Sequence, residues 1–242
     1  MSREAATLLV IERLVKHFGA VQALSGLNLQ VAPGEILGLV GPNGSGKTTA
    51  INVISGIVHP DAGELRFAGR RIHALSPHRR VHLGINRTFQ VPKPFLGLTA
   101  RQNVEVALAY GRRGGGRTVL ELLESVDLRH CADRPAAELN SAEQKRLDLA
   151  RALATSPRLL LVDEVAAGLN PAELERMAAR LKALARSGMA LVVVEHLMGF
   201  IGEITDRVIV MNAGREIYEG ALDDAVRDRN VVEVYLGGES AA

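Results

Sequence analysis

The sequence predicts an α/β fold with a mostly parallel sheet, a small antiparallel sheet beside it and an inserted group of helices. Short apolar runs of strand length, at residues 36–40, 159–162 and 190–194, alternate with longer helical patterns. A glycine-rich turn joins the first of these runs to a helix. The string Val91-Pro92-Lys93-Pro94 then interrupts regular structure and marks the start of the helical insertion.

The first part of the chain is predicted to be rich in strands, which is the basis for the small antiparallel sheet. Pro33-Gly34 and residues 59–63 are turns between these elements. In chain order, the predicted elements are strands at 8–14, 24–31 and 36–40, a helix from 48 to about Gly56, a strand at 64–67, a helix at 76–81 and a strand at 83–90 that ends on Gln90.

Beyond the prolines, helical and strand patterns alternate. We expect residues 111–117, a basic and glycine-rich link, to be a solvated loop rather than a phosphate site, because no strand precedes it. The predicted elements are helices at 99–110, 118–126 and 141–155, a strand at 159–164, a helix at 171–187, strands at 190–194, 207–211 and 216–219, and a charged C-terminal helix.

This order predicts one domain, residues 1–242. We expect residues 1–90 and 157–236 to form the core with its antiparallel sheet, and residues 91–156 to form the helical insertion. Residues 237–242 are expected to be a disordered tail.

The composition is that of an ordinary globular protein, with 47% hydrophobic and 23% charged residues. A formal net charge of +2 is not the strongly basic charge that is typical of nucleic-acid-binding proteins. The single cysteine, Cys131, excludes an internal disulfide, and we expect it to be a core residue rather than a nucleophile. We identify neither a signal peptide nor an apolar run near the ~20 residues of a membrane span, so we expect a cytosolic chain that meets a membrane through a partner.

The glycine-rich turn has the pattern of a phosphate-binding loop, G-x-x-x-x-G-K-[ST]. It reads Gly41-Pro42-Asn43-Gly44-Ser45-Gly46-Lys47-Thr48-Thr49. Its glycines allow backbone N–H groups to approach phosphate oxygens, and the helix that follows directs its positive end at them. We expect Lys47 to reach the β- and γ-phosphates and Thr48 to coordinate Mg²⁺. A chance match is the alternative, but the strand before and the helix after argue against it.

Two carboxylates, Asp163 and Glu164, follow the buried run at 159–162. An apolar run of this kind places a strand inside the sheet, and its carboxyl end then lies beside the phosphate loop. There Asp163 could hold Mg²⁺ and Glu164 could polarise the attacking water. A solvated Asp-Glu pair at a strand end is the alternative, and the upstream loop favours the functional role.

With these motifs in this order, the sequence resembles the ATP-binding-cassette (ABC) ATPases along almost its whole length. The resemblance implies that Phe18 stacks on adenine and that Gln90 touches Mg²⁺ and links the core to the helices. It also implies that His196 contacts the γ-phosphate and that Ala167-Gly168-Leu169-Asn170 is a dimer-contact loop. Taken alone, His196 would more often be a structural histidine.

Residues 139–143 stand in the place of the family signature, which usually reads Leu-Ser-Gly-Gly-Gln. In the family this segment binds the γ-phosphate held by the other subunit. Here the four positions after Leu139 are Asn140, Ser141, Ala142 and Glu143. Asn140 keeps an amide donor, whereas Ala142 lacks the backbone freedom of glycine and Glu143 adds negative charge. The resemblance therefore implies weaker closure of a dimer.

Three short strings narrow the resemblance to the ATPases of branched-chain (hydrophobic) amino-acid importers: Arg87-Thr88-Phe89-Gln90, Ala167-Gly168-Leu169-Asn170-Pro171 and Val234-Tyr235-Leu236-Gly237. The implied ligands are ATP and Mg²⁺. The implied partners are permease subunits, a second ATPase subunit (identical or not) and a periplasmic or extracellular solute-binding protein, but no nucleic acid. The implied place is the inner face of the cell membrane. Importers of urea, amides or other amino acids remain alternatives, because ATPase subunits do not touch the solute.

Three other functions are less consistent with the sequence. A soluble ABC-type ATPase acting on DNA or ribosomes would show two cassettes or a long coiled-coil insertion. A P-loop GTPase would carry Asn-Lys-x-Asp to read guanine, and this string is absent. A binding module without ATPase activity would fit the altered signature, but the residues expected for hydrolysis are all present: Lys47, Gln90, Asp163, Glu164 and His196.

Overall fold

The structure is a computed structural model that describes residues 7–111 and 116–236. The predicted tail at 237–242 and most of the predicted link at 111–117 lie outside the described residues.

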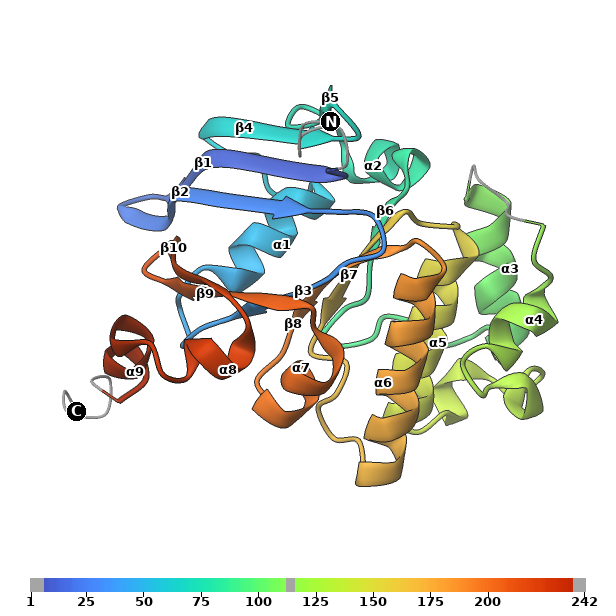
Figure 1. Ribbon diagram of the computed structural model, residues 1–242. Coiled ribbons are helices and arrows are strands. Elements are labelled where there is room, and N and C mark those ends of the chain that lie inside the picture. The colour runs from blue at the N-terminus through green and yellow to red at the C-terminus, as the bar shows by residue number, and fades with distance from the viewer. Residues whose placement is uncertain (1–6, 112–115, 237–242) are drawn as a thin grey trace.

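A six-stranded sheet forms the centre of the molecule (Figure 1), in the order β10-β9-β3-β8-β7-β6. Five of these strands run parallel and only β10 is antiparallel, to β9. The strands are β3 (Ile36–Val40), β6 (Ile85–Arg87), β7 (Leu159–Asp163), β8 (Ala190–Val194), β9 (Arg207–Asn212) and β10 (Arg215–Gly220). The predicted mostly parallel sheet is therefore confirmed.

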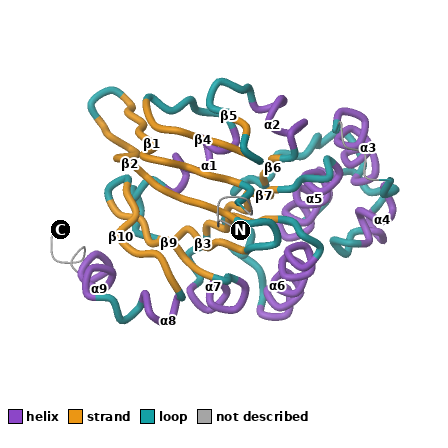
Figure 2. The backbone as a smooth tube through the Cα atoms, turned by 45° about the horizontal axis from the view of Figure 1, so that its top comes forward, coloured by secondary structure: helices purple, strands orange, loops and turns teal. Residues whose placement is uncertain are grey.

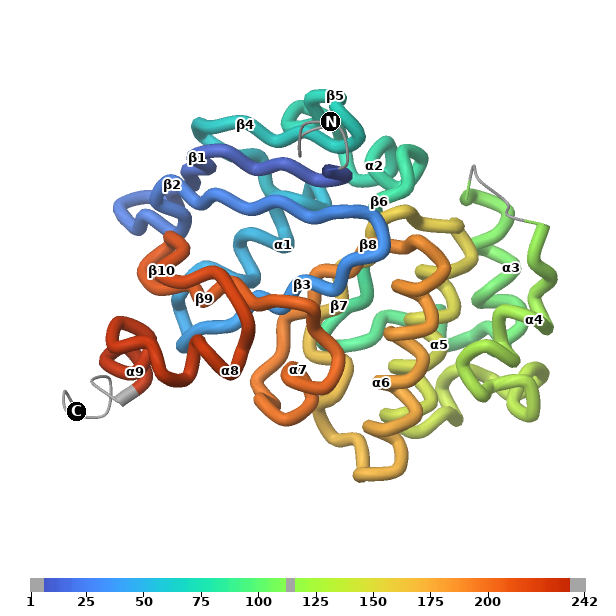
Figure 3. The backbone as a smooth tube through the Cα atoms, in the orientation of Figure 1, coloured from blue at the N-terminus to red at the C-terminus, as the bar shows by residue number. Residues whose placement is uncertain are grey.

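A second sheet of four antiparallel strands lies beside it, in the order β2-β1-β4-β5. Its strands are β1 (Leu9–Phe18), β2 (Val21–Val31), β4 (Ala62–Phe67) and β5 (Arg70–Arg71). This is the predicted small antiparallel sheet. The helix α1 (Lys47–Ser55) lies between the two sheets, as Figure 3 shows.

The central strands are buried on both faces, and their side chains alternate between two hydrophobic cores. On β7, Leu159 and Leu161 join the core that contains α1 and the antiparallel sheet. Leu160 and Val162 join the other core, beneath the helices of the opposite face. Those helices include α5 (Ser141–Ala154), α6 (Pro171–Arg186) and α7 (Met198–Ile204). Figure 2 shows the strands between these two layers.

A helical group lies beyond β6 and consists of α3 (Ala100–Tyr110), α4 (Val119–Glu124) and α5, which contact one another. Each helix begins with a capping box, in which the N-cap side chain and the side chain three residues later satisfy backbone N–H groups. Two 3-10 turns, Arg129–Cys131 and Ala136–Glu138, connect α4 to α5. The remaining helices are α2 (Pro77–Leu83), α8 (Leu222–Ala225) and α9 (Arg229–Leu236), so the predicted C-terminal helix is in fact two.

The predicted strand at 83–90 is wrong at both ends. Leu83 belongs to α2, which ends at Gly84 with φ 103°. The strand β6 ends at Arg87, because the Phe89 N–H donates to the Asp148 carboxylate at 2.8 Å rather than to a neighbouring strand. Gln90 therefore lies past the strand, in the loop that leads to the helical group.

The first hairpin is longer than predicted. The first strand continues to Phe18, which pairs with Val21 across a turn at Gly19.

In the described part of the chain, every helix is too short or too polar to cross a bilayer.

Candidate nucleotide-binding and hydrolysis site

The glycine-rich turn connects β3 to α1, as predicted. Its backbone is possible only for glycine at two points. A Cβ on Gly41 (φ 146°) would lie 2.2 Å from the Met211 carbonyl oxygen, and one on Gly46 (φ 105°) would lie 2.6 Å from the Ala23 oxygen. The loop is therefore packed against the end of β9 and the start of β2, and α1 begins directly after it at Lys47.

The Lys47 ammonium is buried within this loop. It donates to the carbonyl oxygens of Gly41 at 2.7 Å and Pro42 at 2.8 Å. Burial lowers the pKa of Lys47, and the nearby carboxylates of Glu164 and Asp163 oppose that shift. The predicted phosphate-binding cation and the two predicted carboxylates are thus close in space.

The Glu164 carboxylate is held between two other predicted site residues. The Gln90 amide donates to Glu164 Oε2 at 2.6 Å, and His196 Nε2 lies 3.1 Å from Glu164 Oε1. These residues follow β6, β7 and β8, which are neighbours in the sheet. Parallel strands end at the same edge, so the fold brings together side chains far apart in the sequence.

Asp163 is the last residue of β7, and its buried carboxylate is paired with Arg87. The Arg87 Nη2 atom lies 2.9 Å from Asp163 Oδ2, and Nη1 donates to Asn52 on α1 at 2.6 Å. Burial raises the pKa of Asp163, and Arg87 partly opposes that shift. In the sequence, Arg87 stands out only as part of a string typical of importer ATPases, so the sequence does not predict this pair.

Comparison with known proteins agrees with this geometry. The family model for ABC transporters matches residues 24–167. The chain belongs to the ABC transporter family. It is the ATP-binding subunit of such a transporter, an ATPase of the kind that acts with membrane permease components and dimerises.

Two curated relatives are similar over nearly their whole length. A probable branched-chain amino acid transport ATP-binding protein, LivG of Archaeoglobus fulgidus, is 36% identical over 97% of each chain. The high-affinity branched-chain amino acid transport ATP-binding protein BraF of Pseudomonas aeruginosa is 32% identical over 95% of this chain and 98% of its own.

Solved ATP-binding cassettes share the fold. The ADP conformation of MJ1267, an ATP-binding cassette of an ABC transporter, has a TM-score of 0.84 and 31% identity over 96% of this chain and 99% of its own. A dimeric post-hydrolysis cassette, MJ0796 bound to ADP and Pi, has a TM-score of 0.80 and 27% identity over 89% of this chain and 99% of its own.

The donor set of this ABC ATPase fits a hard divalent cation. Thr48 offers a hydroxyl, Asp163 a carboxylate and Gln90 an amide oxygen, and Mg²⁺ prefers such oxygen ligands. The Gln90 NH₂ group is engaged with Glu164, so the amide oxygen is the atom of that side chain that can face a cation.

Phe18 lies at the tip of the β1–β2 hairpin and is 50% exposed. The same hairpin reaches the phosphate-binding loop, since the Ala23 oxygen on β2 packs against Gly46. The Lys16 ammonium lies 5.5 Å from the centre of the Phe18 ring. An exposed ring on the hairpin that contacts the loop suits base stacking, and this role stays a prediction.

The signature segment forms the start of α5, and its own side chains cap the helix. The Asn140 N–H donates to Glu143 Oε2 and the Glu143 N–H donates to Asn140 Oδ1, both at 2.9 Å. The other Glu143 oxygen lies 2.5 Å from Arg134. The negative charge expected to disturb a phosphate is therefore balanced within the chain. Among the described residues, the segment's polar side chains form no hydrogen bond with the phosphate-binding loop.

Cys131 is buried, as predicted, and belongs to the network behind the signature. His130, Cys131 and Glu143 offer atoms of metal-ligand type within 4.8 Å of one another. However, Arg134 donates to both Cys131 Sγ and Glu143, and burial raises the pKa of the Cys131 thiol. A guanidinium already occupies the position that a cation would need, so this cluster is a charge-balanced network.

Three buried charged residues beside the site were not predicted: Lys145 and Asp148 on α5, and Glu195 at the end of β8. The Glu195 carboxylate accepts the Ala166 N–H at 2.6 Å. Lys145 reads in the sequence as an ordinary surface cation of an amphipathic helix. The only available signal was Glu195, an acidic residue directly after the five apolar residues 190–194.

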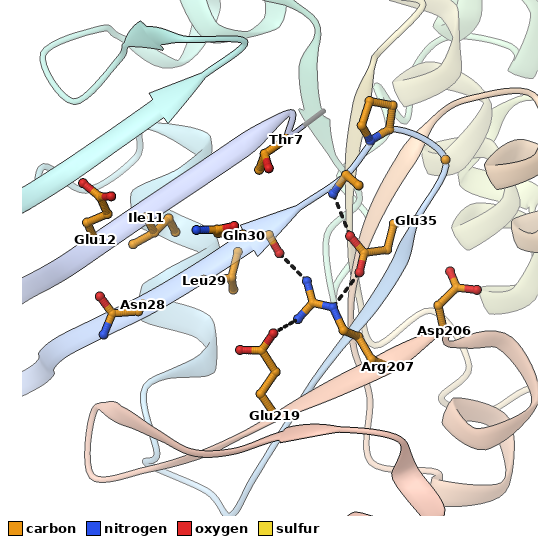
Figure 4. Close-up of a pocket in the computed structure, with 13 residues that line it drawn as sticks. Thr7, Ile11, Glu12, Asn28, Leu29, Gln30, Glu35, Asp206, Arg207 and Glu219 are labelled. Atoms are coloured by element: carbon orange, nitrogen blue, oxygen red, sulfur yellow. Dashed lines mark hydrogen bonds and ion pairs between the residues drawn. The ribbon is translucent and has the colours of Figure 1, made fainter. Parts of the chain in front are cut away.

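A pocket of about 860 Å³ lies at the opposite end of β3 and is not the nucleotide site (Figure 4). Arg207 within it donates to Glu35 and Glu219, at 2.6 and 2.7 Å. Its charged lining consists of four carboxylates and one guanidinium: Glu12, Glu35, Asp206, Glu219 and Arg207. Such a lining repels phosphate.

Proposed function

We propose that this chain powers the uptake of branched-chain or other hydrophobic amino acids through a membrane permease. The observation that carries the hydrolytic part is the convergence of Gln90 and His196 on Glu164, beside the loop that holds Lys47. The solute class is supported by relatives named as branched-chain amino acid transport proteins at 32–36% identity. Related importers of urea, amides or other amino acids are the alternative, followed by a soluble ABC ATPase.

In this proposal, residues 41–49 bind the ATP phosphates and Phe18 stacks on the base. Thr48, Gln90 and Asp163 would hold Mg²⁺, which when bound neutralises charge on the phosphate oxygens. Glu164 takes a proton from the attacking water. In this proposal Gln90 and His196 orient its two carboxylate oxygens, and His196 also contacts the γ-phosphate.

Residues 91–156 act as a helical subdomain in this proposal, and a groove beside it receives the permease. The groove has a volume of about 290 Å³ and lies between α2, α3 and α5. Phe89 and Phe95 line it, and the nearby apolar residues Val91, Leu96 and Tyr110 are exposed. Exposed apolar side chains around a groove suit a protein partner.

The complete system would hold a second ATPase subunit, in which the phosphate-binding loop of one chain faces residues 140–143 of the other. It would also hold a solute-binding protein on the outer side. The chain would lie on the cytoplasmic face of the membrane, attached through the permease.

Affinity purification of the tagged chain from its native membranes in mild detergent tests this assembly. Mass spectrometry should identify a multi-span permease and a second ATPase. Recovery of only ribosomal or chromosomal proteins would favour the soluble alternative.

The solute class is tested in cells in which Glu164→Gln replaces the native chain. In these cells the uptake of radiolabelled leucine is measured, and separately that of urea. Leucine uptake should be lost and urea uptake retained. Cells that carry Lys182→Met, a change of a partly exposed lysine on α6 that pairs with Glu203, are the control. The reverse result for the two solutes would overturn the amino-acid assignment.

A further inference from the structure

Lys145 is a buried lysine that contacts the backbone of residues 164–167, the loop that carries Glu164. The chain has only five lysines, and Lys145 and Lys47 are the two that are buried. From α5, the Lys145 ammonium donates to the carbonyl oxygen of Glu164 at 3.1 Å and to that of Ala167 at 2.5 Å. Burying an ammonium is costly unless it is paired, so these two bonds are what keep it there.

Glu195 holds the same loop through a backbone N–H group. Its carboxylate is 3% exposed and accepts the Ala166 N–H at 2.6 Å. Lys145 and Glu195 also attract each other electrostatically, and both form their hydrogen bonds with the backbone of residues 164–167. The loop is therefore fixed by a buried cation on its carbonyl groups and a buried anion on an N–H group.

This support matters because Glu164 has an unfavourable backbone conformation. Its φ is 48°, in the left-handed region that non-glycine residues rarely adopt. Such a conformation persists only when its surroundings impose it. The Glu164 N–H donates to the carbonyl oxygen of Val194 at 2.9 Å, and Lys145 donates to the carbonyl oxygen of Glu164. Because the side chain follows the backbone, these bonds determine where the carboxylate points.

We propose that Lys145 is a positioning residue for ATP hydrolysis: from α5, it holds residues 164–167 so that the Glu164 carboxylate lies between Gln90 and His196. The proposal rests on the proposed role of Glu164 as the base. Lys145 lies five residues after Asn140, on the helix that carries the signature segment. A shift of α5 relative to β7 changes its two bonds to the loop, so the rate of hydrolysis depends on the position of α5.

Steady-state ATPase kinetics of the full chain with Lys145→Met test this inference. Methionine keeps the length and apolar part of the side chain but removes the donors. We expect kcat to fall about 10- to 100-fold, since a small misplacement of a catalytic group has effects of that size. KM and the affinity for a fluorescent ATP analogue should stay within about two-fold, because Lys145 does not touch the nucleotide.

Two matched variants complete the test. Lys145→Arg keeps donors and should recover part of kcat. Lys182→Met is the same change at a partly exposed lysine away from the loop and should behave as wild type. Melting temperatures measured for every variant separate positioning from loss of folding. If Lys145→Met does not fold, Lys145→Gln, which keeps one neutral donor group, takes its place with the rate normalised to the folded fraction.

An unchanged kcat in Lys145→Met, or a loss that the folded fraction explains, would overturn the inference. An equal loss of nucleotide affinity would also overturn it, because the lysine would then act on ATP. Wild-type protein without any ATPase activity would instead refute the proposed function, so the two failures are distinguishable.

Discussion

Arg87 and Asp163 form a buried ion pair across the neighbouring parallel strands β6 and β7, with 2.9 Å between Nη2 and Oδ2. The same guanidinium donates to Asn52 on α1, the helix that begins in the phosphate-binding loop. One side chain therefore connects α1, the edge strand β6 and the residue proposed to hold Mg²⁺. Both side chains are almost completely buried. If one partner is removed, water therefore cannot take its place beside the other.

Arg87→Met should destabilise the protein by about 3–5 kcal/mol, because it leaves Asp163 buried without its cation. The free energy of unfolding, from urea titration followed by circular dichroism, measures this. Arg129→Met is the matched control, since Arg129 and Glu124 form an exposed pair at 3.2 Å. Such a pair is worth about 0–1 kcal/mol. Equal losses of unfolding free energy in the two variants would mean that the buried pair stabilises the protein no more than the exposed pair does.

Asp148 makes the stability of the fold depend on pH. Burial raises the pKa of Asp148 to about 6 from an ordinary 3.8, although the Phe89 N–H, Arg151 and Arg87 oppose that shift. Below pH 3.8 the carboxyl is protonated in both states. As the pH rises towards 6, the unfolded chain loses the proton first, so folding loses stability, by about 3 kcal/mol once the pH exceeds 6.

Asp148→Asn should therefore be more stable than wild type at pH 8, since asparagine can still accept the Phe89 N–H. The advantage should be about 1 kcal/mol larger at pH 8 than at pH 5, measured by urea unfolding at both values. Asp133→Asn is a control of opposite sign, because Arg101 lowers the pKa of that exposed carboxyl. The Asp133→Asn variant should gain no stability at pH 8. If the stability advantage of Asp148→Asn were the same at pH 5 and pH 8, the raised pKa of Asp148 would be contradicted.

Lys47→Ala should weaken nucleotide binding about 10- to 100-fold, the effect of losing hydrogen bonds from a charged donor. Titration with a fluorescent ATP analogue measures the affinity. The Lys182→Met variant, which alters a partly exposed lysine, should bind as wild type does. Unchanged affinity in Lys47→Ala would refute the role of the loop.

The features that could be predicted from the sequence are local in the chain. The phosphate-binding loop is one continuous string, and its glycines are required by close contacts at Gly41 and Gly46. The buried strands β3, β7 and β8 were recognisable because each is a short apolar run between turns. Asp163 and Glu164 follow such a run directly, so their place at the edge of the sheet was predictable.

The features that could not be predicted depend on contacts between distant segments. Arg87 and Asp163 are 76 residues apart, and only the pairing of β6 with β7 brings them together. The end of β6 depends on Asp148, a side chain from a helix 59 residues later. Lys145 has the sequence character of a surface residue, and its burial follows from the packing of α5 on the loop after β7.

The most direct test of the account is the rate of ATP hydrolysis by Glu164→Gln beside that of wild type, with ATP binding measured on the same samples. Glutamine keeps the size of the side chain but cannot take a proton from water. We predict hydrolysis at least about 100-fold slower, with ATP affinity retained and an ATP-dependent dimer accumulating. Hydrolysis at the wild-type rate in this variant would contradict the assignment of Glu164 as the base, and with it the proposed mechanism.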